Sequence, residues 1–213
     1  MKLSEGIKTL KGRPAEIPDA SRDDLPELFK EMGFTKGVEI GSYFGTYTKT
    51  IAQSGLQIYA VDPWRIMEDY KNPRGQSRLD FQYEATVKTL EPYPNAIVVR
   101  KTSMEALEDF PDESIDFVYI DGNHHFPFVA EDLFWWTKKV KKGGIVCGHD
   151  YIYSPKMQVH QIVDCYINSF GIRNFWVIGR RKYIAGEKRD RWRSWMFIKG
   201  DINPETIQTE VDN

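Results

Sequence analysis

The sequence predicts an α/β protein built on a doubly wound, mostly parallel sheet. Short apolar segments alternate with longer amphipathic segments over most of the chain, which is the pattern of repeated strand–helix units. The 213 residues, 41% of them hydrophobic and 28% charged, suit one globular domain with a buried core. We therefore expect a single domain over residues 21–213, preceded by an N-terminal arm at 1–20.

The arm is polar and interrupted by glycine and proline, so we expect it to be extended or loosely attached. Ser21 is a suitable N-cap for the first helix of the domain, with Asp24 three residues later. Leu25 and Leu28 follow at helical spacing, and Gly33 ends the helix.

The remaining elements follow from hydrophobic periodicity and from the positions of glycine and proline. The expected strands are 37–40, 57–61, 96–99, 115–120, 145–147, 175–178 and 195–198. The expected helices are 45–52, 77–90, 103–109, 127–140 and 159–170, with a loop at 63–76. In the helix over 77–90, the predicted buried face carries Leu79, Tyr83, Val87 and Leu90.

Charged side chains stand where four of the expected strands end. They are Glu39, Asp62, Asp121 and the pair His149-Asp150. The carboxyl ends of parallel strands meet at one edge of the sheet, and sheets of this kind bind their ligands there. The sequence therefore predicts a binding site at this edge.

The segment Gly41 to Gly45 joins the first of these strands to a helix. Glycine lets the backbone approach a ligand closely, and the free N–H groups of a helix N-terminus favour an anion. The spacing E-x-G-x-x-x-G differs from the G-x-G-x-x-G of dinucleotide sites and suits a smaller group such as a carboxylate. A plain tight turn between strand and helix is the alternative.

Asp62 ends the next strand about twenty residues further on. A carboxylate there can accept hydrogen bonds from the ribose hydroxyls of an adenosyl or nicotinamide cofactor. The alternative is an exposed loop acid before Pro63. Trp64 is expected either to cover an adenine ring or to pack in the core or at the rim of the site.

Four segments in this order resemble the motifs of class I S-adenosylmethionine-dependent methyltransferases, in particular the methyltransferase-24 type. They are VEIGSYFG (38–45), YAVDPW (59–64), IDFVYIDGNH (115–124) and KKGGIVCGHDY (141–151). The resemblance covers about residues 21–199 and implies a Rossmann-like, seven-stranded sheet. It also implies that the last strand, Trp195–Lys199, is antiparallel.

The resemblance implies S-adenosylmethionine as the cofactor. By carry-over, Glu39, Gly41, Ser42 and Gly45 border the methionine part, Asp62 holds the ribose, and Ser103 and Met104 lie beside the adenine. We add four neighbouring residues to the expected cofactor contacts: Tyr43, Thr46, Trp64 and Asp121.

Three of the four histidines follow strand ends: His124, His125 and His149. Methyl transfer to a hydroxyl requires alignment of the acceptor and removal of its proton, and imidazole titrates near neutral pH. The catalytic prediction therefore falls on His124, His149 and Asp121. The alternative is that these side chains only cap the strand ends, and this is the expectation for His160, which lies within a helix.

A second hypothesis for the same cluster is a divalent metal held by Asp121, His149 and Asp150. Metal-dependent O-methyltransferases of the catechol and macrolide-sugar types resemble this arrangement, with an acid after the fourth strand and an acidic pair after the fifth. His149 departs from their pattern. Imidazole binds zinc, iron or nickel better than magnesium, so both the use and the identity of a metal stay open.

The charge of the chain bears on the partners that it can bind. The net charge of −2 gives no overall field that would favour nucleic acid or an anionic membrane. The basic stretch 180–193 is expected to be a solvated hairpin. We expect O-methylation of a small-molecule acceptor in the cytoplasm, with homo-oligomerisation left open. The alternatives are a nucleic-acid or protein methyltransferase that uses the hairpin, a nicotinamide-dependent oxidoreductase, or a non-catalytic binding module.

Overall fold

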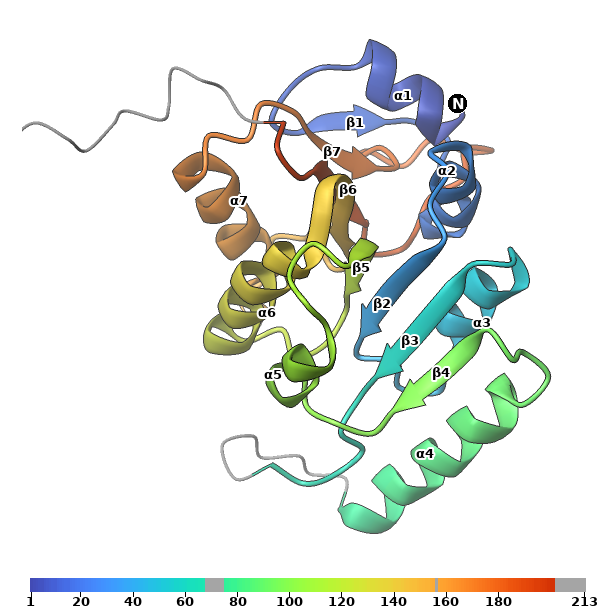
Figure 1. Ribbon diagram of the computed structural model, residues 1–213. Coiled ribbons are helices and arrows are strands. Elements are labelled where there is room, and N and C mark those ends of the chain that lie inside the picture. Colours follow the sequence, from blue (N-terminus) through green and yellow to red (C-terminus); the bar gives the residue numbers. More distant parts are fainter. Residues whose placement is uncertain (68–74, 156, 202–213) are drawn as a thin grey trace, which may run out of the picture.

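The computed structural model describes residues 1–67, 75–155 and 157–201, and part of the expected loop at 63–76 lies outside these ranges. Eight strands of the described chain form one sheet in the order β1-β7-β8-β6-β5-β2-β3-β4 (Figure 1). The strands are β1 (Ala15–Ile17), β2 (Lys36–Ile40), β3 (Gln57–Val61), β4 (Ala96–Val99), β5 (Ile115–Ile120), β6 (Val140–Gly148), β7 (Phe175–Ile178) and β8 (Trp195–Ile198). Strand β8 is antiparallel to β6 and to β7, and the other neighbouring pairs are parallel.

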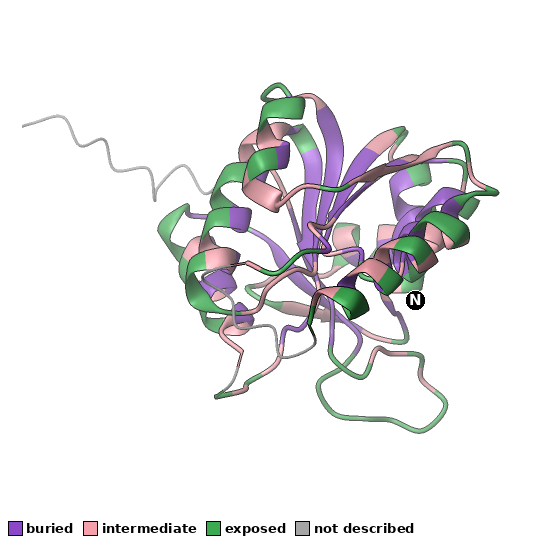
Figure 2. Cartoon of the chain, turned by 90° about the horizontal axis from the view of Figure 1, so that it is seen from below, coloured by how far each residue is buried: buried purple, intermediate pink, exposed green. Residues whose placement is uncertain are grey.

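Helices cover both faces of the sheet. They are α1 (Leu3–Thr9), α2 (Leu25–Glu31), α3 (Thr46–Gln53), α4 (Gln76–Leu90), α5 (Ser103–Ala106), α6 (Phe126–Lys139) and α7 (Val159–Ser169), with 3₁₀ turns at Arg22–Asp24 and Leu107–Asp109. One apolar cluster unites α6 and α7 with one face, and a second unites α1, α2 and α3 with the other. Figure 2 shows the buried strands between helices whose outer surfaces are exposed. The predicted Rossmann-like, doubly wound class with an antiparallel last strand is confirmed.

The sheet has one strand more than the seven that the resemblance implies. The additional strand, β1, comes from the N-terminal arm, which was expected to be extended or loosely attached. Ala15 to Ile17 pair in parallel register with Trp176 to Ile178, and Ile17 is fully buried. A three-residue strand is too short to show a period in sequence, and only its pairing with β7 reveals it. The division between an arm and a domain at residue 21 stays a prediction.

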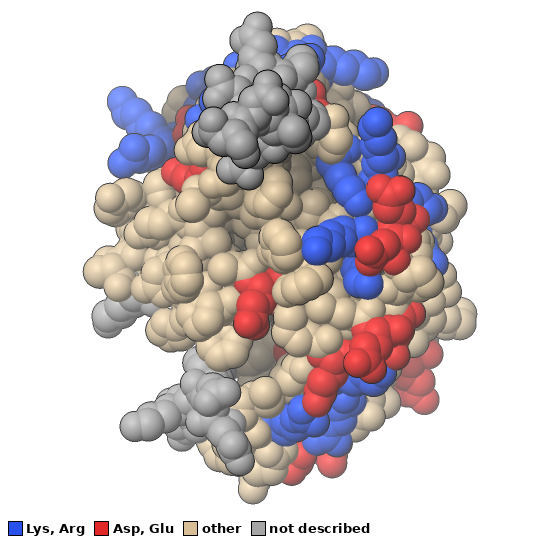
Figure 3. Space-filling view, turned by 60° about the vertical axis from the view of Figure 1, so that its left-hand side comes forward, with Lys and Arg blue, Asp and Glu red and all other residues tan. Residues whose placement is uncertain are grey.

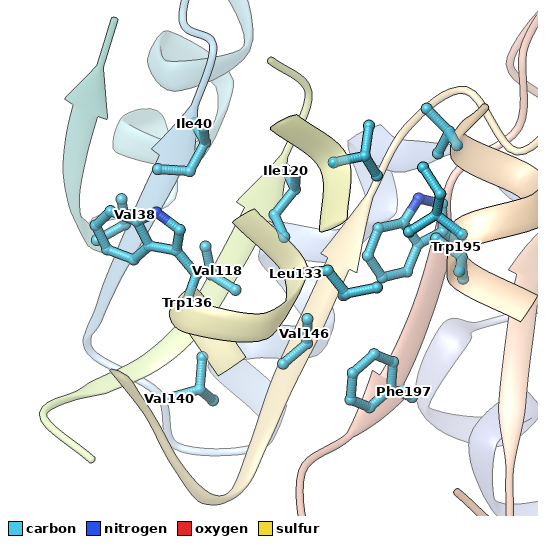
Figure 4. Packing of buried hydrophobic residues seen from close by; sticks show 14 of the residues in the cluster. Val38, Ile40, Val118, Ile120, Leu133, Trp136, Val140, Val146, Trp195 and Phe197 are labelled. Atoms are coloured by element: carbon cyan, nitrogen blue, oxygen red, sulfur yellow. The ribbon is translucent and has the colours of Figure 1, made fainter. Parts of the chain in front are cut away.

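Helix α6 is fixed to the sheet by large apolar side chains. Leu133 and Trp136 are fully buried and pack toward Val118 and Val146 on the neighbouring strands β5 and β6 (Figure 4). Burial of each such side chain contributes about 1.5–3 kcal/mol. This packing holds the turn between β5 and α6, which carries Asp121 and His124, at a fixed place above the sheet.

Helix α4 buries Leu79 and Leu90 as predicted, but its buried face does not include Val87. It buries Leu79, Gln82, Thr86 and Leu90, whereas Val87 is 43% exposed. The Thr86 hydroxyl donates to the carbonyl of Tyr43 in the glycine loop at 2.8 Å. The prediction for Val87 was wrong because this polar contact with the loop, rather than apolar burial alone, sets the rotation of the helix.

Candidate functional site

The carboxyl ends of four parallel strands meet at one edge of the sheet. Ile40 of β2 is paired with Val61 of β3 on one side and with Ile120 of β5 on the other, and Ile120 is paired with Gly148 of β6. The residues that follow these strand ends are therefore neighbours. The chain order reverses between β2 and β5, and a sheet of this type opens a ligand-binding crevice at such a point.

Two glycines shape the loop between β2 and α3. Gly41 has φ +88°, and a Cβ atom on it would lie 2.2 Å from the carbonyl oxygen of Asp121. Gly45 has φ +70° and caps the N-terminus of α3, whose first residue is Thr46. Any side chain at position 41 would therefore collide with the turn after β5, so glycine is required there.

Glu39 lies beneath this loop and is 2% exposed. Its carboxylate accepts from the hydroxyl of Ser42 at 3.2 Å and from that of Thr48. Burial raises the pKa of Glu39 to about 7, because the hydroxyl donors only partly offset the loss of water and the charge of Asp121 raises it further. Glu39 thus links Ser42, at the start of the loop, to Thr48 in the first turn of α3.

Asp62 follows β3 and is fixed by two backbone donors. Its carboxylate accepts from the N–H of Tyr43 at 3.0 Å and from the N–H of Trp64 at 3.1 Å. The indole N–H of Trp64 donates to the carbonyl of Tyr43 at 2.9 Å, which closes a ring of contacts between the two loops. Burial raises the pKa of Asp62, while the two amides lower it. A carboxylate has about four acceptor positions, so oxygen lone pairs remain for a ligand.

Trp64 is 1% exposed and packs against Tyr83 of α4, with ring centroids 5.4 Å apart. It is a core residue in this structure, which agrees with the second of its two predicted placements. Ser103 and Met104 form the first turn of α5 after β4, where Thr102 accepts from the N–H of Glu105 as an N-cap. Their predicted roles at the cofactor stay predictions.

The predicted cluster of histidine and aspartate forms at the ends of β5 and β6. The Nε2 atom of His124 lies 2.6 Å from Oδ2 of Asp150 and 3.5 Å from Oδ1 of Asp121. Burial opposes the charge of His124, but the two carboxylates outweigh it and raise its pKa to about 9. The same contacts lower the pKa of Asp150 despite its burial. The ring of His124 thus sits between two carboxylates, which favour its protonated form.

His149 also contacts Asp150, and its predicted catalytic and metal-binding roles stay predictions. Its Nδ1 atom lies 3.2 Å from Oδ1 of Asp150, and its backbone carbonyl accepts from the indole of Trp195. The candidate ligand atoms that lie within 4.8 Å of one another belong to Asp121, His124 and Asp150. Among the residues that the structure describes, His124 therefore completes the group in place of His149.

Sequence analysis missed Arg22, which borders this cluster, and Asp190, which holds Arg22 in place. Arg22 lies 3.5 Å from Oδ2 of Asp121, and its guanidinium stacks 5.0 Å from the ring of Tyr47. Its backbone N–H donates to Asp190 of the segment between β7 and β8 at 2.8 Å. The N-terminal segment and the basic hairpin thus meet at the edge of the site. Neither residue belongs to a motif, so only the tertiary structure reveals them.

Three residues of the site have left-handed backbone conformations that are unusual for a residue with a side chain. The φ angles are +54° at Tyr43, +42° at Trp64 and +58° at Asp150. Each costs on the order of 1–3 kcal/mol, and such residues concentrate at functional sites. At Asp150 this conformation accompanies the contacts of its carboxylate with both histidines.

Comparison with known families gives this geometry a context. The methyltransferase-24 family, described as a methyltransferase domain, matches residues 38–151. This match covers more than half of the chain and includes the glycine loop, Asp62, His124 and Asp150. The chain belongs to this family. The predicted resemblance is thereby confirmed, and the match lends no support to a nicotinamide-dependent oxidoreductase.

Two curated relatives of this methyltransferase domain are themselves uncharacterized. A protein of Sinorhizobium fredii is 27% identical over 124 residues, which are 53% of this chain and 13% of that protein. A protein of Acanthamoeba polyphaga mimivirus is 26% identical over 198 residues, which are 89% of this chain and 85% of that protein. The chain thus spans a small part of the first relative and most of the second.

Solved structures with the same fold act on different kinds of acceptor. An O-methyltransferase from Bacillus cereus in complex with SAH aligns with a TM-score of 0.59 at 15% identity, over 83% of this chain and 80% of that one. The tomaymycin-synthesis O-methyltransferase from Streptomyces achromogenes in complex with SAM gives 0.55 at 14%, over 84% and 79%. An rRNA methylase from Streptococcus thermophilus gives 0.57 at 14%, over 82% and 93%. These similarities establish the fold alone.

The close approach of Gly41 to the turn after β5 can be tested with two alanine variants. Gly41→Ala and Gly55→Ala both place a side chain at a positive φ, +88° and +90°, but only the first meets other atoms within 4 Å. We expect Gly55→Ala to cost about 1–2 kcal/mol of unfolding free energy, from the conformation alone. Gly41→Ala should cost clearly more, measured by urea denaturation. Equal losses would show that the contact with Asp121 is unimportant.

The buried carboxyl of Glu39 should make stability depend on pH. Because its folded pKa of about 7 lies above the ordinary value of 4.5, the folded state binds more protons between these values and loses stability as the pH rises. In Glu39→Gln this loss is removed. The unfolding free energy of the variant relative to the original protein should therefore rise by roughly 1 kcal/mol per pH unit from pH 4.5 to 7 and then level off. A difference that is constant over this range would contradict the burial of a titrating group.

Proposed function

We propose that this protein uses S-adenosylmethionine to methylate a hydroxyl group of a small acceptor. The observation that carries the proposal is the convergence of Asp121, His124 and Asp150 within 4.8 Å, directly beside the glycine loop. The loop and Asp62 offer a cofactor site, and the cluster offers acid–base groups on the neighbouring strand ends. Family membership and the shared fold of two O-methyltransferases support this reading.

The cofactor half of the site binds by preorganised polar groups. The N-terminus of α3, opened by Gly45, presents backbone N–H groups to the carboxylate of the methionine part. Asp62, already oriented by two amides, accepts hydrogen bonds from the ribose hydroxyls. Both groups are held before the ligand arrives, so little ordering is needed on binding.

The acceptor half would align a hydroxyl with the methyl group of the cofactor, and the carboxylates of the cluster would be the groups that accept the proton of the hydroxyl. His124 is held between two carboxylates, one of which belongs to Asp121 in the turn that contacts Gly41. Asp121 and Asp150 provide negative charge that favours a cation at this position. Arg22 pairs with Asp121 and limits the net negative charge of the cluster.

The same three side chains fit a divalent metal ion. One imidazole nitrogen and two carboxylate oxygens form a mixed donor set, which suits manganese, iron or zinc better than magnesium. Asp121, His124 and Asp150 would hold the ion between them. The ion would replace the proton that His124 shares with the carboxylates. When bound, such an ion would acidify an acceptor hydroxyl.

A small acceptor is favoured over a nucleic acid by the distribution of charge. Three basic residues of the 180–193 segment or its end are paired with acids: Arg180 with Glu187, Lys188 with Asp24, and Arg193 with Glu16. In the view of Figure 3, basic and acidic side chains are interspersed beside a broad uncharged surface. Nucleic-acid binding instead favours a continuous basic face. The hairpin-based nucleic-acid or protein methyltransferase remains the second hypothesis.

The proposed compartment is the cytoplasm. Cys147 and Cys165 are both free thiols, as in proteins of reducing compartments. No helix in the described ranges combines the length and the apolar character needed to cross a membrane. Homo-oligomerisation stays an open prediction.

Binding of S-adenosylhomocysteine tests the cofactor half of the proposal. We expect isothermal titration calorimetry to show one site, and Asp62→Ala to weaken binding by about 1–3 kcal/mol, which is roughly 5- to 150-fold. Asp112→Ala is the control, because this exposed acid pairs with Lys139 away from the site. A folded protein that does not bind at hundreds of micromolar would refute the proposal.

Methyl transfer with and without metal tests the acceptor half. With labelled S-adenosylmethionine and a panel of catechols and hydroxylated sugars, we expect transfer that rises on addition of Mn²⁺ and is reduced at least 100-fold in Asp150→Ala. Calorimetric titration with MnCl₂ should show one site in the original protein and none in this variant. Transfer only to ribosomal RNA or protein would favour the second hypothesis.

The matched control for this experiment is His160→Ala. His160 lies on α7 with Nε2 3.6 Å from Asp164, outside the group formed by Asp121, His124 and Asp150. Its replacement should leave both manganese binding and methyl transfer within about twofold of the original protein. An equal loss in both variants would indicate general destabilisation rather than a role of Asp150 at the site.

A further inference from the structure

The outer surface of α6 and the end of α7 carry a patch of exposed aromatic rings. Phe134 and Trp135 are 38% and 43% exposed, and Phe170, directly after α7, is 47% exposed. The ring centroid of Phe134 lies 5.1 Å from that of Trp135 and 6.3 Å from that of Phe170. Exposed apolar residues are common one at a time, whereas a contiguous patch of them marks an interaction site.

The patch lies on the side of the molecule that α6 and α7 form together (Figure 1). Figure 3 turns this side forward and shows a broad area with few charged side chains. The inner face of α6 already packs on the sheet, where Leu133 and Trp136 are fully buried. The outer rings of Phe134 and Trp135 therefore do not serve the core, and a partner outside the chain is needed to bury them.

Opposite charges stand at the two ends of this patch on α6. Glu131, Phe134, Trp135 and Lys138 follow one another at the spacing i, i+3, i+4 and i+7, so they form a single stripe on the helix. The ammonium group of Lys138 lies 4.4 Å from the ring centroid of Phe134 and 4.1 Å from that of Trp135. Glu131 is exposed, and about 10 Å of helix separates it from Lys138, too far for the two to pair.

The stripe is complementary to a second copy of itself. Glu131 precedes Phe134 by three residues, and Lys138 follows Trp135 by three. A two-fold axis between Phe134 and Trp135 would therefore set Glu131 of each copy opposite Lys138 of the other, because contacts across such an axis occur in exchanged pairs. Parallel packing of the two helices would set like charges opposite each other. The charges thus favour antiparallel packing of two copies of this chain.

We propose that this protein forms a homodimer in which the outer faces of α6 and α7 meet, with the two α6 helices antiparallel. Phe134 and Trp135 are the central anchors, as large aromatic side chains usually are in interfaces. The two pairs of Glu131 with Lys138 fix register and direction at the rim. The inference is independent of the proposed function, because no residue of the stripe belongs to the histidine–aspartate cluster.

Sedimentation velocity tests the proposal. Over a range of about 1 to 200 µM, we expect the monomer at the low end and the dimer at the high end, as for a contact of modest size. Lys138→Glu and Glu131→Lys should each weaken association by about tenfold or more, because each sets like charges opposite each other. The double variant Glu131→Lys/Lys138→Glu should recover the original dissociation constant to within about threefold, because opposite charges face each other again.

Mixing the two single variants gives a second readout. One variant carries only acids at the ends of the stripe and the other only bases, so each should be monomeric alone and the equimolar mixture should form heterodimers. Lys88→Glu is the matched control, since it makes the same change of charge at an exposed position of α4, outside the stripe. It should leave the dissociation constant unchanged. Circular dichroism verifies that every variant is folded.

Three results would overturn the proposal. The first is a folded original protein that stays monomeric up to the highest concentration. The second is a dimer that persists unchanged in both single variants, because the interface would then lie elsewhere. The third is loss of the dimer in both single variants with no recovery in the double variant or in the mixture, because Glu131 and Lys138 would then not face each other.

Discussion

The contact between Gly41 and the backbone of Asp121 and Gly122 is the constraint on which the site depends. The two turns approach so closely that there is no room for even one methyl group at position 41. This contact exists because β2 and β5 are neighbours in the sheet although other elements separate them in the chain. It places the glycine loop directly beside the turn that carries the histidine–aspartate cluster. Methyl transfer requires this proximity, since donor and acceptor must be aligned in line.

The two buried acids Glu39 and Asp150 are stabilised in different ways. On one side Glu39 is almost surrounded by protein and is stabilised by hydroxyl donors, which keeps the loop rigid. On the other side Asp150 is equally buried but is paired with two histidines. A buried carboxylate needs either donors or a cation, and the two regions use one solution each. Only the second region, among the described residues, has a donor set that could hold a metal ion, which is why we propose that the chemistry lies there.

The fold and the outline of the site could be predicted from sequence because they follow from local patterns. The strands Gln57–Val61, Ala96–Val99 and Ile115–Ile120 have the bounds that their apolar runs predict. The strand ends that carry Glu39, Asp62 and Asp121 follow from the same runs. Strand β1 and the burial of Thr86 in place of Val87 on α4 were not predicted, because their positions depend on contacts with β7 and with the glycine loop. Neither contact leaves a periodic signal.

The sequence by itself determined the class of the protein: a doubly wound sheet with a glycine loop, an acid after β3, and histidine and aspartate after β5 and β6. Only the tertiary structure decided which of these side chains meet. His124 contacts both Asp121 and Asp150, whereas His149 contacts Asp150, and spacing along the chain does not encode this difference. Arg22 comes to the edge of the cluster from a segment without a motif. Periodicity fixes where strands end, whereas the direction of a side chain in a turn depends on the atoms packed around it.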